Sequence, residues 1–195
     1  MGRPRSFDED AALTGAMEVF RRKGYVAASI RDLEEATGLK AGSIYHSYGD
    51  KAGIFAAAMT HYNRAVVDAR LAEHAPVCAG LAGLRNLFVS LMHEPNGTSF
   101  GCLITNSAIE FGGSTKVPNG VDIGLRTLAA TFEQRLRAAH RSGALRRDLK
   151  PAVAASRLIA LYQGVLVLVR AGWDKPALER MIKDEFKHLG GEYDA

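Results

Sequence analysis

The sequence predicts an all-α protein, and three observations support this fold class. Apolar residues recur at helical spacing along the 195 residues, no segment beyond Pro76 alternates like a β-strand, and glycine or proline with polar neighbours separates the helical stretches. Hydrophobic residues make up 47% of the chain and charged residues 24%, as in ordinary globular proteins. We therefore expect about nine helices around a core that needs neither disulfides nor a metal.

Four helices are expected in the first part of the chain. Ser6 and Glu9 have the spacing of a capping box, and Gly24 follows a basic last turn, so the first helix should cover 7–23. Gly38 separates the next two helices, and Asp50 caps a long fourth helix. The second and third helices are expected at 29–37 and 41–47, and the apolar face of the fourth helix reaches Ala69.

Five more helices are expected after Pro76. They are marked by apolar residues from 81 to 91, near 102–111, from 121 to Gly143, after Pro151, and from Asp174 to Leu189. The helix after Pro151 is apolar almost all round between Leu158 and Val169, so it should be buried on more than one side. That apolar run is about 12 residues long, short of the ~20 that cross a bilayer, and we expect no membrane span.

Cysteine content, the N-terminal segment and net charge indicate where the protein acts, but they do not locate a nucleic-acid-binding site. Cys78 and Cys102 form neither a disulfide framework nor a Cys-x-x-Cys motif, and the basic N-terminus turns acidic at Asp8, unlike a signal peptide. We therefore expect a cytoplasmic protein with free thiols. The net charge is +4, but the first 51 residues carry eight basic and eight acidic side chains. Global charge therefore does not reveal a nucleic-acid surface.

The helices at 29–37 and 41–47, with Gly38 between them, form a candidate helix-turn-helix. In the second helix Ile44 and Tyr48 lie four residues apart and can face the core, while other side chains point elsewhere. Small residues at 41–43 would let this helix enter the DNA major groove, which is roughly 12 Å wide. Periodicity alone is equally compatible with a helical hairpin that only packs on the first helix.

One ordered set of residues is more specific: Gly24-Tyr25, Ser29-Ile30, Leu33, Ala36, Gly38-Leu39, Gly42-Ser43-Ile44-Tyr45-His46, Tyr48-Gly49-Asp50-Lys51 and Phe55. This set, over about residues 7–55, strongly resembles the DNA-binding domain of the TetR family of bacterial transcriptional repressors. The resemblance implies a helix-turn-helix DNA-binding domain at 1–51 and a helical ligand-binding and dimerisation domain at 52–195. It also implies a dimeric repressor that binds a double-stranded, pseudo-palindromic operator and is released by a small-molecule inducer.

The resemblance also suggests roles for individual residues. Those that match its phosphate-contacting positions are Ser29, Tyr45, His46 and Lys51, and those that match its base-reading positions are Ala41, Gly42 and Ser43. Lys40 precedes the recognition helix, and Lys51 opens the next helix, where a cation disfavoured by the helix dipole is better explained by a phosphate. Arg3 and Arg5 resemble a short basic arm in the minor groove, and an unstructured tail is equally compatible.

The second half of the chain predicts a dimer and an inducer site. The helices after Pro151 and Asp174 would pair with their copies in a four-helix interface, unless both are buried within one subunit. An apolar or amphipathic inducer would bind among the helices between about residues 81 and 169. Its candidate lining residues, each also explained as plain core, are Phe88, Met92, Phe100, Cys102, Asn106, Phe132, Tyr162, Leu166 and Trp173.

Enzyme motifs are absent from the sequence, and no catalytic residue, cofactor or metal site is expected. There is no nucleophile elbow, phosphate loop or dinucleotide fingerprint, and Glu185 with His188 is a lone Glu-x-x-His pair. The alternative function is a small-molecule-binding helical protein whose helix-turn-helix is only structural. Cys102 is either a thiol sensor at a helix N-terminus or, as we favour, a small buried hydrophobe. A run of basic residues from Arg135 to Lys150 is interpreted as a solvated helix end.

Overall fold

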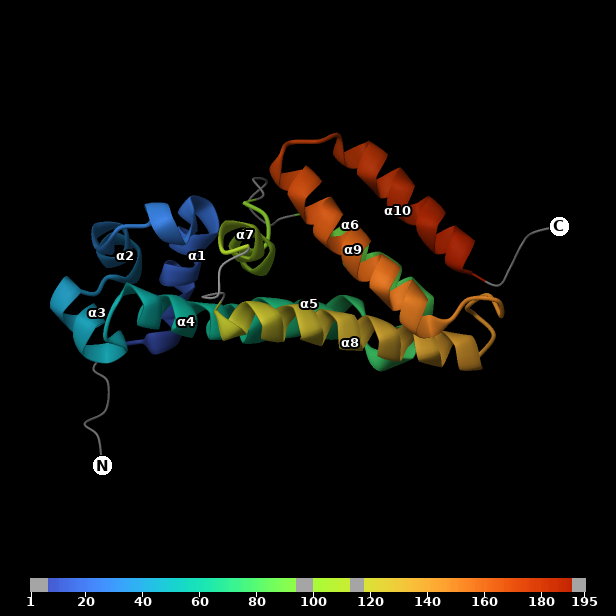
Figure 1. The fold of residues 1–195 in the computed structure, drawn as a ribbon, viewed down its shortest axis with the longest axis horizontal. Coiled ribbons are helices and arrows are strands. Elements are labelled where there is room, and N and C mark those ends of the chain that lie inside the picture. Colours follow the sequence, from blue (N-terminus) through green and yellow to red (C-terminus); the bar gives the residue numbers. More distant parts are fainter. Residues whose placement is uncertain (1–6, 94–99, 113–117, 191–195) are drawn as a thin grey trace, which may run out of the picture. The chain divides into compact units, whose positions relative to one another are not determined.

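The computed structural model describes residues 7–93, 100–112 and 118–190, and within these ranges the regular structure is helical apart from one isolated β-bridge (Figure 1). The all-α prediction is therefore confirmed. The α-helices are α1 (Glu9–Ala27), α2 (Ile30–Thr37), α3 (Ala41–Tyr48), α4 (Lys51–Tyr62), α5 (Ala69–His74), α6 (Gly80–Ser90), α7 (Leu103–Glu110), α8 (Asn119–Arg141), α9 (Pro151–Arg170) and α10 (Lys175–Leu189).

The nine expected helices correspond to ten α-helical segments in the described residues, because the long helix after Asp50 is divided. A π-helical turn, η1 (Asn63–Asp68), separates α4 from α5. A short 3-10 turn, η2 (Val77–Ala79), precedes α6. The Asp50 carboxylate accepts a hydrogen bond from the N–H of Gly53 (2.7 Å) and caps α4 as expected.

Both ends of α1 differ from the prediction. Its N-cap is Asp8, whose carboxylate accepts from the N–H of Ala11 (3.1 Å), while Ser6 lies outside the described residues. Gly24 does not end the helix: it adopts φ +79° and ψ 174°, and helical hydrogen bonding resumes to Ala27. Glycine adopts this positive φ without the penalty that a Cβ brings, so the residue produces a kink where the sequence predicted a stop.

Two compact units make up the chain, and the first comprises Met1–Val66 and Cys102–Gly124. In it α1 packs on α2, α4 and α7. Phe20 and Phe55 meet edge to face at a ring distance of 4.8 Å, and both are fully buried with Leu33 and Ile44. This unit includes α4 and α7, which the sequence assigned to the second domain, so the functional division at residue 51 stays a prediction.

The second unit comprises Val67–Gly101 and Leu125–Ala195, and its core is aromatic. Phe88 lies 5.6 Å from Phe132, 5.2 Å from Tyr162 and 5.3 Å from Phe186, measured between ring centres. Arg135 is buried in this unit, which corrects its interpretation as a solvated residue. Its Nε donates to the carbonyl oxygen of Ala75 (3.0 Å), so the charge ties α8 to the end of α5.

By length and composition α9 is apolar enough to cross a membrane, a property it shares with the core helices of many proteins. One side of it is buried in the second unit, through residues that include Leu158, Tyr162 and Val165. The apolar character of α9 therefore reflects partial burial within the fold, although its other side remains exposed.

Candidate nucleic-acid interface

The turn between α2 and α3 is built by local hydrogen bonds. Gly38 adopts the left-handed conformation (φ +70°), and its N–H donates to the carbonyl oxygen of Glu34 (3.0 Å). Thr37 Oγ1 donates to the carbonyl oxygen of Leu33 (2.6 Å) and accepts from the N–H of Leu39 (3.2 Å). These bonds satisfy the end of α2 and fix the direction in which the chain leaves it.

A side chain of α2 also caps α3. Glu34 Oε1 accepts a hydrogen bond from the N–H of Ala41 (2.8 Å), the first residue of α3, whose N-cap residue Lys40 provides no side-chain bond. A carboxylate at this position also compensates the positive end of the helix dipole. Glu34 is not recognisable as a cap from the sequence, because capping patterns join residues two or three positions apart rather than seven.

The two faces of α3 differ, and of the two residues expected to face the core Tyr48 is only half-buried. Ile44 is fully buried, whereas Gly42, Ser43, Tyr45 and His46 are exposed, with Tyr45 47% exposed. A Cβ added to Gly42 would meet nothing within 4 Å, so the backbone here is open to a close approach. The candidate residues Ala41 to His46 thus lie on one short helix, α3, and Lys40 is its N-cap residue (Figure 1).

Ser29 and Lys51 begin the helices on either side of α3. Ser29 is exposed, but its hydroxyl accepts from the Asp32 N–H (3.2 Å) and its own N–H donates to Asp32 Oδ2 (2.9 Å), which completes the capping box of α2. The hydroxyl also donates to Asp32 Oδ2 (2.8 Å). Lys51 is half-buried, with its ammonium nitrogen 4.7 Å from the centre of the Tyr25 ring and 3.3 Å from the carbonyl oxygen of Val26. Both side chains therefore have intramolecular partners, and those of Lys51 lie too far away in the sequence to be recognised from it.

Electrostatics link α1 to α2 beside this surface. Lys23 Nζ lies 2.6 Å from Asp32 Oδ1, and this hydrogen bond, with those from Ser29, holds the pKa of Asp32 well below its ordinary value. Arg31, next to Asp32, is 86% exposed in its side chain and pairs with Glu35. Sequence reasoning did not single out Arg31, although its exposure beside the cap of α2 makes it a further cation of this surface. Arg3 and Arg5 lie outside the described residues.

The candidate inducer residues have different environments in the described part of the chain. Phe88, Phe132 and Tyr162 pack on one another in the core of the second unit, where Met92 and Leu166 are also buried. The others differ in environment: Cys102 (buried) and Asn106 (half-buried) belong to the first unit, Phe100 is half-buried, and Trp173 is 58% exposed. The geometry gives these residues a packing role, and a ligand-binding role stays a prediction.

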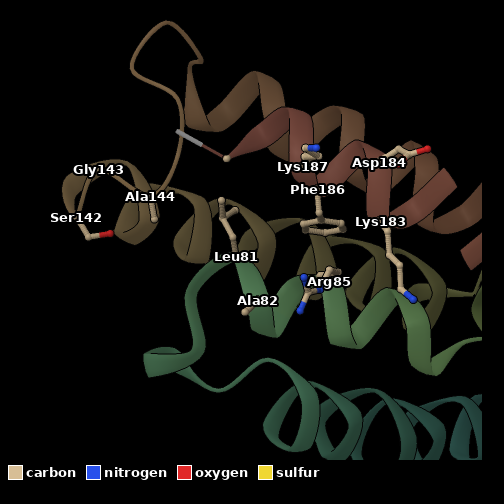
Figure 2. Close-up of a pocket in the computed structure, with 11 residues that line it drawn as sticks. Leu81, Ala82, Arg85, Ser142, Gly143, Ala144, Lys183, Asp184, Phe186 and Lys187 are labelled. Atoms are coloured by element: carbon tan, nitrogen blue, oxygen red, sulfur yellow. The ribbon is translucent and has the colours of Figure 1, made fainter. Parts of the chain in front are cut away.

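A cleft of about 790 Å³ lies elsewhere in the second unit, between α6, the turn after α8, and α10 (Figure 2). Leu81 and Phe186 form apolar parts of its lining, and Arg85, Lys183 and Lys187 contribute three cations. Among the described residues that line it, Asp184 is the one acidic residue, and Lys183 pairs with Glu179 on its own helix (2.7 Å). The cleft is therefore amphipathic with excess positive charge. In the described part of the chain, no group of three or more His, Cys, Asp or Glu residues is arranged to hold a metal ion.

Comparison with known proteins gives two family matches. The family described as bacterial regulatory proteins, tetR family, matches residues 12–58, and the tetracyclin repressor-like C-terminal domain matches residues 79–184. The exposed face of α3 thus lies within the first match, and the cleft within the second except for three lining residues, Phe186, Lys187 and Gly190.

Individual transcriptional regulators are similar to this chain over different shares of its length. The transcriptional repressor ComR of Escherichia coli (strain K12) is 45% identical over 73 residues, which span 37% of this chain but only 33% of ComR. The transcriptional repressor DhaR of Mycobacterium sp. (strain GP1) is 25% identical over 88% of this chain and 87% of its own length. A cysteine mutant of the TetR family regulator CifR, solved with 26-bp operator DNA, has a TM-score of 0.80 at 25% identity, covering 96% of this chain and 100% of that one.

Proposed function

Because the chain belongs to the TetR family of bacterial regulatory proteins, we propose that it is a transcriptional repressor that binds a pseudo-palindromic DNA operator. The observation that carries this proposal is the exposed face of α3, opposite the fully buried Ile44. Helix-turn-helix proteins place such a face in the major groove. The relatives ComR and DhaR, both named transcriptional repressors, support the same function.

Within this interface we assign two kinds of contact. Ala41, Gly42 and Ser43 read base edges, because small residues at the start of the helix let its backbone approach the groove. The anchoring contacts to phosphates come from Ser29, Lys40, Tyr45, His46 and Lys51. Arg3 and Arg5 precede α1 in the sequence, and as a basic arm they would add contacts in the minor groove.

The repressor acts as a homodimer through α9 and α10, with one helix-turn-helix for each half-site. On the exposed side of α9 small residues recur every four positions: Ala152, Ser156, Ala160 and Gly164. Val153 and Val167 flank them at 48% and 41% exposure, and Met181 on α10 is 38% exposed. Small side chains allow a second helix to approach closely, and the apolar neighbours would be covered by the same face of the partner.

A small molecule releases the repressor from DNA in this proposal. Binding must favour a form of the dimer whose recognition helices no longer match half-sites ~34–36 Å apart, since a ligand shifts an equilibrium only through differential affinity. The cleft in Figure 2 suits an amphipathic anion, because Leu81 and Phe186 lie beside Arg85 and Lys187. The protein would act in the cytoplasm, where the chromosomal operator lies.

Footprinting of the protein on the DNA upstream of its own gene tests the function, together with its sedimentation in solution. We expect a protected palindromic segment, loss of protection with His46→Ala, and a dimer at micromolar concentration. If no specific segment is protected, the alternative remains: a small-molecule-binding protein whose helix-turn-helix is only structural.

A further inference from the structure

At the kink in α1, side chains of α7 satisfy the backbone. In a straight helix the N–H of Tyr25 would donate to the carbonyl oxygen of Arg21. Here Glu110 accepts from the N–H groups of both Tyr25 and Val26, at 2.7 Å each. Asn106 Nδ2 donates to the carbonyl oxygen of Arg21 (3.2 Å). Asn106 and Glu110 lie one turn apart, so a single face of α7 forms hydrogen bonds to the backbone on both sides of the kink.

The same two residues of α1 are also held by α4. Lys51 donates to the carbonyl oxygen of Val26 and lies over the Tyr25 ring. That ring also contacts Phe55 of α4 at 5.1 Å between centres. The Tyr25-Val26 segment is therefore clamped between a carboxylate, which binds its N–H groups, and an ammonium, which binds its carbonyl side.

This segment determines how the helix-turn-helix leaves α1. Ala28, two residues after Val26, is 1% exposed, and Ser29 immediately begins the capping box of α2. Between the clamp and α2 the chain thus has little freedom to change direction. α3 follows α2 through the Gly38 turn and the Glu34 cap, so the orientation of the exposed face of α3 depends on the clamp.

We infer that Glu110 is a positioning residue for operator binding. This inference rests on the proposed function. The Glu110 carboxylate fixes the exit from α1 and through it the angle of α3, although the side chain itself touches no DNA. Charge-assisted hydrogen bonds are roughly twice as strong as neutral ones, which suits a carboxylate to this role. At Gly24, any Cβ would lie 2.9 Å from a carboxylate oxygen of Glu110, so kink and clamp fit each other.

The test compares Glu110→Gln with wild type and with Glu73→Gln, an exposed glutamate of α5 that loses the same charge. Glutamine keeps one acceptor oxygen but turns an NH₂ group toward the second N–H, so the clamp loses a bond. We expect operator affinity to fall about tenfold, the equivalent of one charged hydrogen bond, with affinity for non-specific DNA at low salt unchanged within about twofold. Removal of a negative charge alone would strengthen DNA binding, so the expected sign opposes simple electrostatics.

Two further measurements separate the possible outcomes. Circular dichroism with thermal denaturation shows whether the Glu110→Gln variant folds. If that variant does not fold, the same measurements are made on Glu110→Asp, which keeps the charge on a shorter side chain. Amide hydrogen exchange of Tyr25 and Val26 should accelerate in the variant. The inference is overturned if wild type binds the operator and Glu110→Gln binds it with the same affinity. It is also overturned if Glu110→Gln loses affinity for operator and for non-specific DNA equally. Failure of wild type to bind any specific DNA instead overturns the proposed function, and the inference with it.

Discussion

The ammonium nitrogen of Lys51 lies 4.7 Å from the centre of the Tyr25 ring and 3.3 Å from the carbonyl oxygen of Val26. An ammonium has three donors, and this geometry uses one of them. The ring holds the cation near the start of α4 instead of leaving it on a freely rotating side chain. Lys51 can therefore contact a phosphate from a preorganised position.

The first prediction follows from this position. Lys51→Ala should weaken binding to every DNA sequence and flatten the plot of log affinity against log salt by about one unit, because one phosphate contact is lost. Electrophoretic or anisotropy titrations at several salt concentrations measure the slope. Lys150→Ala, an exposed lysine ahead of α9, is the control and should leave the slope unchanged. Weaker binding with an unchanged slope would mean that Lys51 acts only through Tyr25 and Val26.

The second prediction separates reading from anchoring on α3. Ser43→Ala should alter the ranking of operators that differ by single base pairs, because Ser43 is exposed at the start of the helix. Tyr45→Ala should weaken binding to all of them alike, since phosphate contacts carry no sequence information. Competition titrations over a base-substituted operator series measure both. Indistinguishable profiles for the two variants contradict the assignment.

The sequence predicted those features of the fold that local patterns encode. The Ser29-Asp32 and Asp174 caps and the turn at Gly38 all involve residues within four positions of each other. The kink at Gly24 was not predictable in this way, because its N–H groups bind Glu110, some 85 positions later. For the same reason Arg135 was misplaced: its partner is the carbonyl oxygen of Ala75, 60 positions away. For the aromatic residues of the second half the sequence left both a core role and an inducer site open, because it does not show which rings pack on one another.

The third prediction concerns pH. The Lys23 ammonium and the Ser29 bonds hold the pKa of Asp32 well below its ordinary value. A depressed pKa means that this carboxylate stabilises the fold above its unfolded pKa of about 3.9, and that this contribution is lost as pH falls toward the folded pKa. The difference in Tm between wild type and Asp32→Asn should therefore be largest near pH 6 and shrink toward pH 2. Asp184→Asn, an exposed control on α10, provides the reference. A difference that grows on acidification contradicts the argument.

The fourth prediction tests the dimer surface of α9. Ala160→Glu places a charge in the exposed row of small residues and should produce a monomer at micromolar concentration, because a charge buried between copies of α9 would be unpaired. Operator affinity should fall at least about tenfold, since each half-site is then bound alone. Ala72→Glu on the exposed side of α5 makes the same change elsewhere and should remain dimeric. Sedimentation measures the oligomeric state of both variants. A dimeric Ala160→Glu variant would place the interface on another surface.

The last prediction concerns the two thiols, which differ in exposure. Cys102 is the N-cap residue of α7 and is 5% exposed, whereas Cys78 in η2 is exposed. Reagents reach an exposed sulfur first, so iodoacetamide should modify native wild type at Cys78 and leave Cys102 unmodified until the protein unfolds. Peptide mass spectrometry after timed quenching locates the label, and Cys78→Ser should remain unlabelled over the same period. Because the buried Cys102 then serves packing, mild peroxide should leave operator binding by wild type and Cys102→Ser equal. Loss of binding by wild type but not by Cys102→Ser would instead make Cys102 an oxidant sensor.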